Sequence, residues 1–455
     1  MVAHFSKGLR RLRAWKHRRG ALGAAIAFCL GGALTLAACS VDLAPLSTPD
    51  AAIDAGDAGA DACVGCGDAS VADACAPGLS PWGFGRCCPP ELDVEFDDAS
   101  VAGVLIHGEH AIVYGARGTR PWVARVDRCD GSVVTQSTDF IAEPGQFRSA
   151  TLAGDTLMLA GSYDAASKIR WMAAWGNATT LSNFSTYLAT TSTNSIASAV
   201  AMPSSAQAWF VGTHRYQQSD QRAMLMGLDL NSPDPCLEYP KGWFGGGVGL
   251  DASKVLAASV DGYKLRVTSY ESSTCAAGQC ACNSASNSVD LDQRYLVSLH
   301  ASAMHAGELY VVGASFKQFP PVAGQGAYVA RIKPDLSLDA FQVWGPSGSL
   351  LDDARALDFS ADGTLAVGVA RACDFTLFQL GECSLGAVFG LPAGFDGSSG
   401  VTFGTTLSDW NDVTGVRFEP EPKGGLLLVG NRLPASPTEK TVAALKRCTR
   451  DGACP

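Results

Sequence analysis

The feature that most constrains the fold of this chain is a short apolar run that recurs seven times and usually ends in glycine. The copies lie 46 to 62 residues apart, which is too long for leucine-rich or ankyrin units and suits propeller blades of four strands. In one copy, "KVLAAS", Ala258 takes the glycine position. The other six copies end at Gly115, Gly161, Gly212, Gly313, Gly368 and Gly430.

The remaining strands fall where a four-stranded blade needs them. Around Gly313, for example, the run "ELYVVG" follows "VSLHASAMH" and precedes "YVARIKP" and the more polar "LDAFQVW". Continuous apolar runs suit inner strands covered on both faces, and polar alternation suits an outer edge. We therefore predict an all-β, seven-bladed β-propeller of four-stranded antiparallel blades over residues 91–455.

One strand is surplus at the start of this region and one is missing at its end. The run "ELDVEFD", residues 91–97, precedes the first copy and has no local partner, whereas the last copy has no fourth strand. Pairing the first run with the last blade would close the ring and remove two exposed edges. We therefore expect residues 91–97 to complete the seventh blade.

The stretch 307–370 resembles a known repeat. "ELYVVGASFKQFPPVAGQGAYVARIKPDLSL" is similar to the SBBP seven-bladed β-propeller repeat of secreted bacterial proteins, with its Tyr-Val-x-Gly strand, Phe-Pro and Ala-Tyr-Val-Ala-Arg strand. Elsewhere the match is degenerate, since Ala258 replaces glycine and most copies lack Phe-Pro. The resemblance implies a propeller fold and export, and it assigns no catalytic residue.

The N-terminus has the pattern of an export signal. Seven basic residues precede the apolar stretch "GALGAAIAFCLGGALTLAAC". Leu-Ala-Ala-Cys at Leu36–Cys39 resembles the bacterial lipobox, whose cysteine is lipid-modified after cleavage, and Ser40 resembles an outer-membrane rather than an inner-membrane signal. We predict a lipoprotein signal peptide at 1–38 and lipidation at Cys39; a retained membrane-spanning helix is the alternative.

Residues 39–62 follow as an Ala/Asp-rich tether, which we expect to be disordered because it has few large apolar side chains. Its aspartates do not have the spacing of a calcium loop. Removing the signal takes away seven basic residues and changes the formal net charge from −10 to −17. Such a chain repels phosphate backbones, so we expect no nucleic-acid partner.

Sixteen cysteines in an exported chain indicate disulfides rather than free thiols. We predict a small Cys-rich head at residues 63–90, in which Cys63-x-x-Cys66 is the alternative candidate for a metal or redox pair. Two local disulfides are also predicted. Cys373 and Cys383 bracket a hairpin-like segment, and Cys448 and Cys454 bracket "TRDGA".

The sequence contains histidines and an acid pair of the kinds found in metal and catalytic sites, but we do not interpret them as such sites. Turn histidines at His107, His110 and His305 invite a metal site, but they belong to the first and fifth copies, so we expect solvated side chains and no metal or other cofactor. The acid pair Asp352-Asp353 suits hydrolysis, although such pairs are more often solvated or bound to turn amides. We assign no catalytic residue.

Three tryptophans, Trp243, Trp344 and Trp410, suit either a sugar platform or packing between blades, and we favour packing. The leading functional prediction is a lipid-anchored binding or scaffold protein of the bacterial outer membrane, with a protein or glycan ligand. The alternatives are a glycan-directed propeller enzyme with carboxylates at the central channel, and a purely structural envelope lipoprotein.

Overall fold

The computed structural model describes residues 80–81, 86–89, 91–190, 194–216, 220–231, 235–240, 242–251, 253–271, 284–317, 326–344, 351–373, 375–376, 379–380, 383–420, 424–432 and 442–454. The predicted signal peptide, the tether with Cys39, and most of the Cys-rich head lie outside these residues, so their boundaries stay predictions. Every regular element within the described ranges is a β-strand. None of those residues form a helix with the length and apolarity to cross a bilayer.

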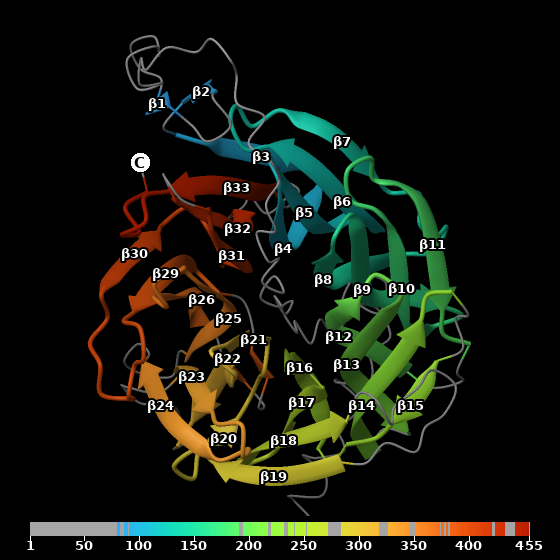
Figure 1. The fold of residues 1–455 in the computed structure, drawn as a ribbon, viewed down its shortest axis with the longest axis vertical. Helices are drawn as coiled ribbons and strands as arrows, with labels where there is room; N and C mark the ends of the chain where they lie inside the picture. Colours follow the sequence, from blue (N-terminus) through green and yellow to red (C-terminus); the bar gives the residue numbers. More distant parts are fainter. Residues whose placement is uncertain are drawn as a thin grey trace, which may run out of the picture. The chain divides into compact units, whose positions relative to one another are not determined.

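Seven antiparallel sheets are arranged as the blades of a ring, as predicted (Figure 1). Blade 1 contains β4 (Ala99–His107), β5 (His110–Arg117), β6 (Arg120–Asp127) and β7 (Val133–Ser137). Blade 2 contains β8 (Gly145–Ala153), β9 (Thr156–Ala165), β10 (Lys168–Asn177) and β11 (Ser182–Leu188). Blade 3 contains β12 (Asn194–Ser204), β13 (Gln207–Tyr216), β14 (Asp220–Asp229) and β15 (Cys236–Glu238). Blade 4 contains β16 (Phe244–Asp251), β17 (Lys254–Asp261), β18 (Lys264–Glu271) and β19 (Ser284–Asp290).

The next two blades have local additions to this plan. In blade 5 the inner strand is split into β20 (Tyr295–Leu296) and β21 (Ala301–His305), which both pair with β22 (Glu308–Phe316); β23 (Gly326–Ile332) and β24 (Leu338–Trp344) follow. Blade 6 contains β25 (Leu351–Phe359), β26 (Leu365–Cys373), β29 (Leu385–Leu391) and β30 (Phe403–Leu407). Between β26 and β29, β27 (Phe375–Thr376) and β28 (Gln379–Leu380) form a small hairpin.

Blade 7 closes the ring in the way the strand count predicted. It contains β31 (Gly415–Phe418), β32 (Leu426–Arg432), β33 (Val442–Cys448) and, at its outer edge, β3 (Asp93–Asp97). The first and last strands of the propeller therefore lie side by side, with Asp93 opposite Lys446 and Asp97 opposite Val442. Upstream of β3, the short strands β1 (Ser80–Pro81) and β2 (Cys87–Cys88) form a separate two-stranded sheet.

The recurring glycines have a different role from the strand stop that the sequence indicated. Gly212, for example, lies in the middle of β13, opposite a β-bulge in the inner strand β12. The bulge brings the backbone close, and a Cβ on Gly212 would lie 1.9 Å from the carbonyl oxygen of Ile196. Four other copies have the same close approach, with distances of 2.0–2.2 Å: Gly115, Gly161, Gly313 and Gly430.

The register corrects two assignments made from the pattern. Ser259, rather than Ala258, pairs across the bulge of β16 in blade 4, so the glycine position there is one residue later than expected. A Cβ on Gly368 would meet Val413 of the neighbouring blade instead of its own inner strand. These glycines thus occur where the backbone of another segment comes close. They recur with the blade period because most blades have such a position.

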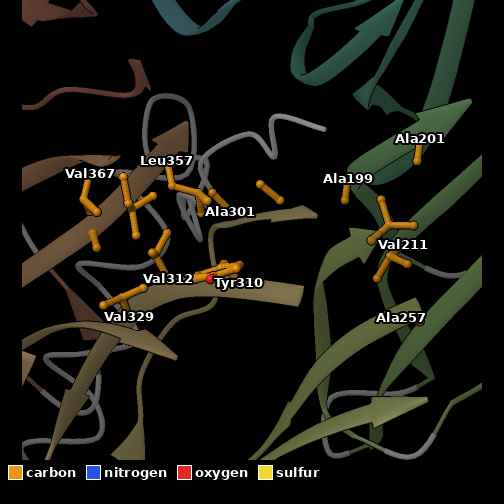
Figure 2. Close-up of a cluster of buried hydrophobic side chains, with 14 of the residues drawn as sticks. Ala199, Ala201, Val211, Ala257, Ala301, Tyr310, Val312, Val329, Leu357 and Val367 are labelled. Carbon is orange, nitrogen blue, oxygen red and sulfur yellow. The ribbon is translucent and has the colours of Figure 1, made fainter. Parts of the chain in front are cut away.

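The hydrophobic core lies between the blades. The largest cluster joins side chains of blades 3, 4, 5 and 6, including Val211, Ala257, Val312 and Leu357 (Figure 2). Other clusters join blades 1 and 7, 1 and 2, 2 and 3, 4 and 5, and 6 and 7. Each blade therefore buries its apolar faces against its neighbours, which explains why the sheets form a ring.

Candidate functional site

The acid pair singled out from the sequence lies at the start of the inner strand of blade 6. Asp352 and Asp353 are both 0% exposed, so they are not solvated; of the two environments expected for such a pair, only binding to backbone amides remains. An ionised carboxylate is retained in such a place only when protein groups replace its water. The partners of the two acids therefore decide what the pair does.

Asp353 is held by three side chains from two blades. Ser298 Oγ donates a hydrogen bond to Asp353 Oδ1 at 2.7 Å, His300 Nε2 lies 2.8 Å from Oδ2, and Arg355 Nε donates to Oδ2 at 3.1 Å. Burial alone raises the pKa of Asp353, but His300, Arg355 and Ser298 together hold this pKa below its ordinary value. The Asp353 carboxylate is therefore ionised at neutral pH.

Arg355 extends these contacts toward the ring closure. Arg355 Nη1 donates to Asp412 Oδ2 at 2.7 Å, and Asp412 Oδ1 accepts from the backbone N–H and Nδ2 of Asn431 at 2.9 and 3.0 Å. Asn431 Oδ1 in turn accepts from the backbone N–H of Val101 in blade 1. Hydrogen bonds thus link the inner ends of blades 5, 6, 7 and 1. We call Ser298, His300, Asp353, Arg355, Asp412 and Asn431 the inner polar network.

The network contains a serine, a histidine and an aspartate, but their arrangement is not that of a nucleophile triad. In a triad the imidazole lies between the hydroxyl and the carboxylate and takes the hydroxyl proton. Here the Ser298 hydroxyl donates to the same carboxylate that His300 contacts, and Ser298 Oγ also accepts from the backbone N–H of Ala314 at 2.8 Å. All three side chains are buried. This geometry favours a structural role in joining blades.

Asp352 has a different environment from its neighbour. Its Oδ1 accepts from the backbone N–H of Ala372 at 3.0 Å, and its Oδ2 accepts from Arg371 Nε at 3.1 Å. Burial raises the pKa of Asp352 above its ordinary value, and the Ala372 N–H and Arg371 only partly offset that effect. The pKa values of the two carboxyl groups are therefore shifted in opposite directions, as in some acid–base pairs, but both groups are enclosed.

A second buried charge cluster lies where the ring closes. Arg447 donates to both carboxylate oxygens of Glu419, at 2.8 and 3.1 Å, and Arg128 Nη1 donates to Glu419 Oε1 at 3.2 Å. The side chains come from blades 7 and 1 and are all buried. Removing one member of such a group leaves a buried charge without its partner. The cluster therefore joins the two ends of the propeller.

The histidines that suggested a metal site do not converge. His107 Nε2 lies 3.1 Å from Asp155 Oδ1, His110 Nδ1 lies 2.9 Å from Arg125 Nη2, and the His305 ring stacks on Phe359. Burial and the nearby Arg125 charge lower the pKa of His110. In the part of the chain that the structure describes, no three His, Cys, Asp or Glu side chains gather as a metal site.

The three tryptophans have different environments. Trp410 is fully buried in the cluster between blades 6 and 7, and Trp344 packs against the largest core cluster, so packing was the correct interpretation for both. Trp243 is 47% exposed, and the packing prediction was wrong for it. Nearby Tyr263 is 58% exposed. The sequence analysis had considered an aromatic platform at Trp243 and had not favoured it.

Disulfides fix both predicted local loops. Cys373 is bonded to Cys383 across the base of the β27–β28 hairpin, and Cys448 is bonded to Cys454. Cys88, which belongs to the predicted Cys-rich head, is bonded outside that segment, to Cys129 in the turn after β6, 41 residues away. Nothing in the sequence, apart from the presence of Cys129, indicated this disulfide.

The strand order and pairing define the class of this protein as a seven-bladed β-propeller. No protein-family model and no curated protein matches the chain, so the resemblance to the SBBP repeat stays a prediction. Solved structures similar to it include Sqt1 from Chaetomium thermophilum, with 14% identity over 78% of this chain and 96% of that chain and a TM-score of 0.42.

Two other similar structures are YjhT and a KlHsv2 variant with loop 6CD replaced by a Gly-Ser linker. YjhT has 10% identity over 69% of this chain and 99% of that chain, with a TM-score of 0.43. The KlHsv2 variant has 10% identity over 68% of this chain and 86% of that chain, with a TM-score of 0.40. Similarity at this level carries no argument about function.

Proposed function

We propose that this chain is an exported, lipid-anchored β-propeller that acts as a binding protein at the bacterial outer membrane. The lipobox-like Leu36–Cys39 and the SBBP-like stretch 307–370 support the address. The observation that carries the binding role is the contrast between two sets of residues. The acids considered for catalysis are enclosed and bound to protein groups, whereas aromatic rings of the same propeller are exposed.

A ring of blades suits such a role because its core and its surface are separable. The inner polar network and the inter-blade clusters hold the scaffold, and the connections between strands are free to vary. Exposed aromatic side chains give much contact area and lose little conformational entropy on binding. The enzyme alternative requires solvent-accessible carboxylates, which Asp352 and Asp353 do not supply.

The anchor is tested by labelling cells that express the full chain with an alkynyl fatty acid. The expected result is a labelled protein in the outer-membrane fraction, with the label lost in Cys39→Ser. Cys29→Ser is the matched control, since Cys29 lies inside the predicted signal and is removed with it. A label retained in Cys39→Ser, or no label at all, would refute the lipoprotein prediction.

The binding role is tested with the full chain purified in detergent. Isolated envelope fragments are titrated into a fixed amount of protein, and the bound fraction is measured by co-sedimentation. We expect saturable binding to envelope fragments and none to protein-free lipid vesicles. Binding that never saturates, or equal binding to both, contradicts a specific binding protein and favours the purely structural alternative.

A further inference from the structure

Several aromatic rings of blades 4 and 5 lie close to one another. The Tyr263 and Tyr295 centroids lie 5.3 Å apart in an edge-to-face arrangement, and those of Tyr295 and Phe316 lie 5.2 Å apart. At the other end, a Cβ on Gly262 would lie 3.5 Å from the Trp243 indole, so this ring lies over the turn before Tyr263. We call Trp243, Tyr263, Tyr295 and Phe316 the aromatic strip.

Backbone hydrogen bonds position the strip. The Trp243 N–H donates to the Val260 carbonyl at 2.7 Å, and the Leu296 N–H donates to the Gly262 carbonyl at 2.9 Å. The second bond fixes the first residues of blade 5 against the tight turn of blade 4, where Gly262 has a φ of 58°. The backbone that carries these rings is therefore fixed, which reduces the backbone entropy lost on binding.

The exposed part of the strip is small. Trp243 is 47% exposed and Tyr263 is 58% exposed, whereas Phe316 is buried beneath Tyr295. With about 200 Å² for each large aromatic side chain, the exposed parts of Trp243 and Tyr263 together offer on the order of 200 Å² of surface. A stable protein partner covers about 800 Å² on each side. The strip is thus too small to form a typical protein interface by itself, and its area suits a small ligand such as a short oligosaccharide.

Paired charges flank the strip. Arg266 donates from Nε and Nη2 to Asp261 Oδ2, at 2.8 and 2.6 Å, and from Nη1 to Ser288 Oγ at 2.6 Å. Lys317 Nζ lies 2.7 Å from Asp292 Oδ2. Within each pair a cation and a carboxylate compensate each other, and both pairs present polar hydrogen-bonding groups beside the strip. Such a surface recognises a neutral ligand that has both apolar faces and hydroxyl groups.

We propose that the aromatic strip is a binding site for a neutral oligosaccharide, whose sugar rings stack on Trp243 and Tyr263 while its hydroxyl groups bond to the flanking charged pairs. The apolar C–H face of a pyranose matches a flat aromatic ring, and its hydroxyl edge matches the carboxylate and guanidinium groups. This inference rests on the proposed binding function and names its ligand class. The acidic character of the chain disfavours anionic glycans.

The test is calorimetric titration of the full purified chain with soluble neutral hexasaccharides of the cello, chito, malto and laminari series. At least one of them should bind with a Kd below about 1 mM, and Trp243→Ala should weaken that binding about tenfold or more. Tyr263→Ala provides a second variant at a more exposed position. Val401→Ala removes an exposed apolar side chain elsewhere and should change the Kd less than about twofold.

Several results would overturn the inference. One is that none of these sugars binds at about 10 mM, and another is that the Kd is unchanged in both aromatic variants. A third is saturable binding to envelope fragments that depends on Trp243 but is destroyed by protease treatment of the fragments, which would identify a protein ligand. In that case the proposed binding function stands and the glycan assignment fails. If the unmodified chain does not bind envelope fragments at all, the proposed function itself is refuted.

Discussion

The inner polar network predicts a large and specific effect of one atomic exchange, Asp353→Asn. The side chain keeps its shape but loses the charge that Ser298, His300 and Arg355 contact. Breaking a buried ion pair by removing one partner costs about 3–5 kcal/mol of unfolding free energy. We expect a value near 3 kcal/mol, because Arg355 keeps its second carboxylate partner, Asp412, at 2.7 Å.

The assay is urea unfolding of the full chain, followed by tryptophan fluorescence. With an m-value of about 3 kcal/mol per M, a loss of about 3 kcal/mol lowers the urea midpoint by about 1 M. Asp292→Asn is the matched control, since Asp292 is exposed and paired with Lys317 at 2.7 Å. Its urea midpoint should stay close to that of the unmodified chain. Equal midpoints for Asp353→Asn and the unmodified chain would refute the structural role and revive a catalytic one.

The pH dependence of the same variant gives an independent check. The pKa of Asp353 is lower in the folded chain than its ordinary value of about 3.9, so its contribution to stability is fully present above that pH. The contribution is lost as the pH falls through the lower, folded-state value. The difference in midpoint between the unmodified chain and Asp353→Asn should therefore be constant near neutral pH and shrink below about pH 4. A difference that grows on acidification would contradict this assignment.

Three further predictions follow from the ring. Gly212→Ala should lower the free energy of unfolding by more than about 2 kcal/mol. Gly400→Ala, where an added Cβ meets nothing within 4 Å, should change it by no more than about 0.5 kcal/mol. Similar losses in the two variants would refute the close-approach argument. Replacing Cys88 and Cys129 by serine opens a loop with a sequence separation of 41 and should cost about 4 kcal/mol, and an unchanged unfolding midpoint would be the contrary result. Deleting residues 91–97 should lower the melting temperature by about 5 °C or more, and no change would show that β3 contributes nothing to closure.

The sequence predicted the fold because the relevant signals are local and repeated. Apolar runs and turn glycines recur at the blade period. Counting the strands showed one surplus strand at 91–97 and one missing strand in the last blade, and these two observations predicted the pairing. The Cys373–Cys383 and Cys448–Cys454 loops were readable for a related reason, since short loops leave few choices of partner. Repetition and short sequence separation made these features predictable.

The site was less predictable because its contacts depend on register between blades. Ser298 and Asp353 are 55 residues apart and meet only after the inner strands of blades 5 and 6 are placed side by side. His300 is buried, and no sequence pattern around it indicated burial. Trp243 lies in the connection between β15 and β16. Its exposure depends on the path of that connection, which no local periodicity encodes.

The position of the Cys88–Cys129 bond has a mechanical consequence. The bond lies upstream of β3 and joins the incoming chain to blade 1, whereas β3 itself completes blade 7. Tension applied to the chain before Cys88 is therefore carried through the covalent bond into blade 1, and it does not peel the five residues of β3 from β33. A propeller held by its N-terminal segment, as the proposed lipid anchor would require, can therefore carry tension without the separation of β3 from β33.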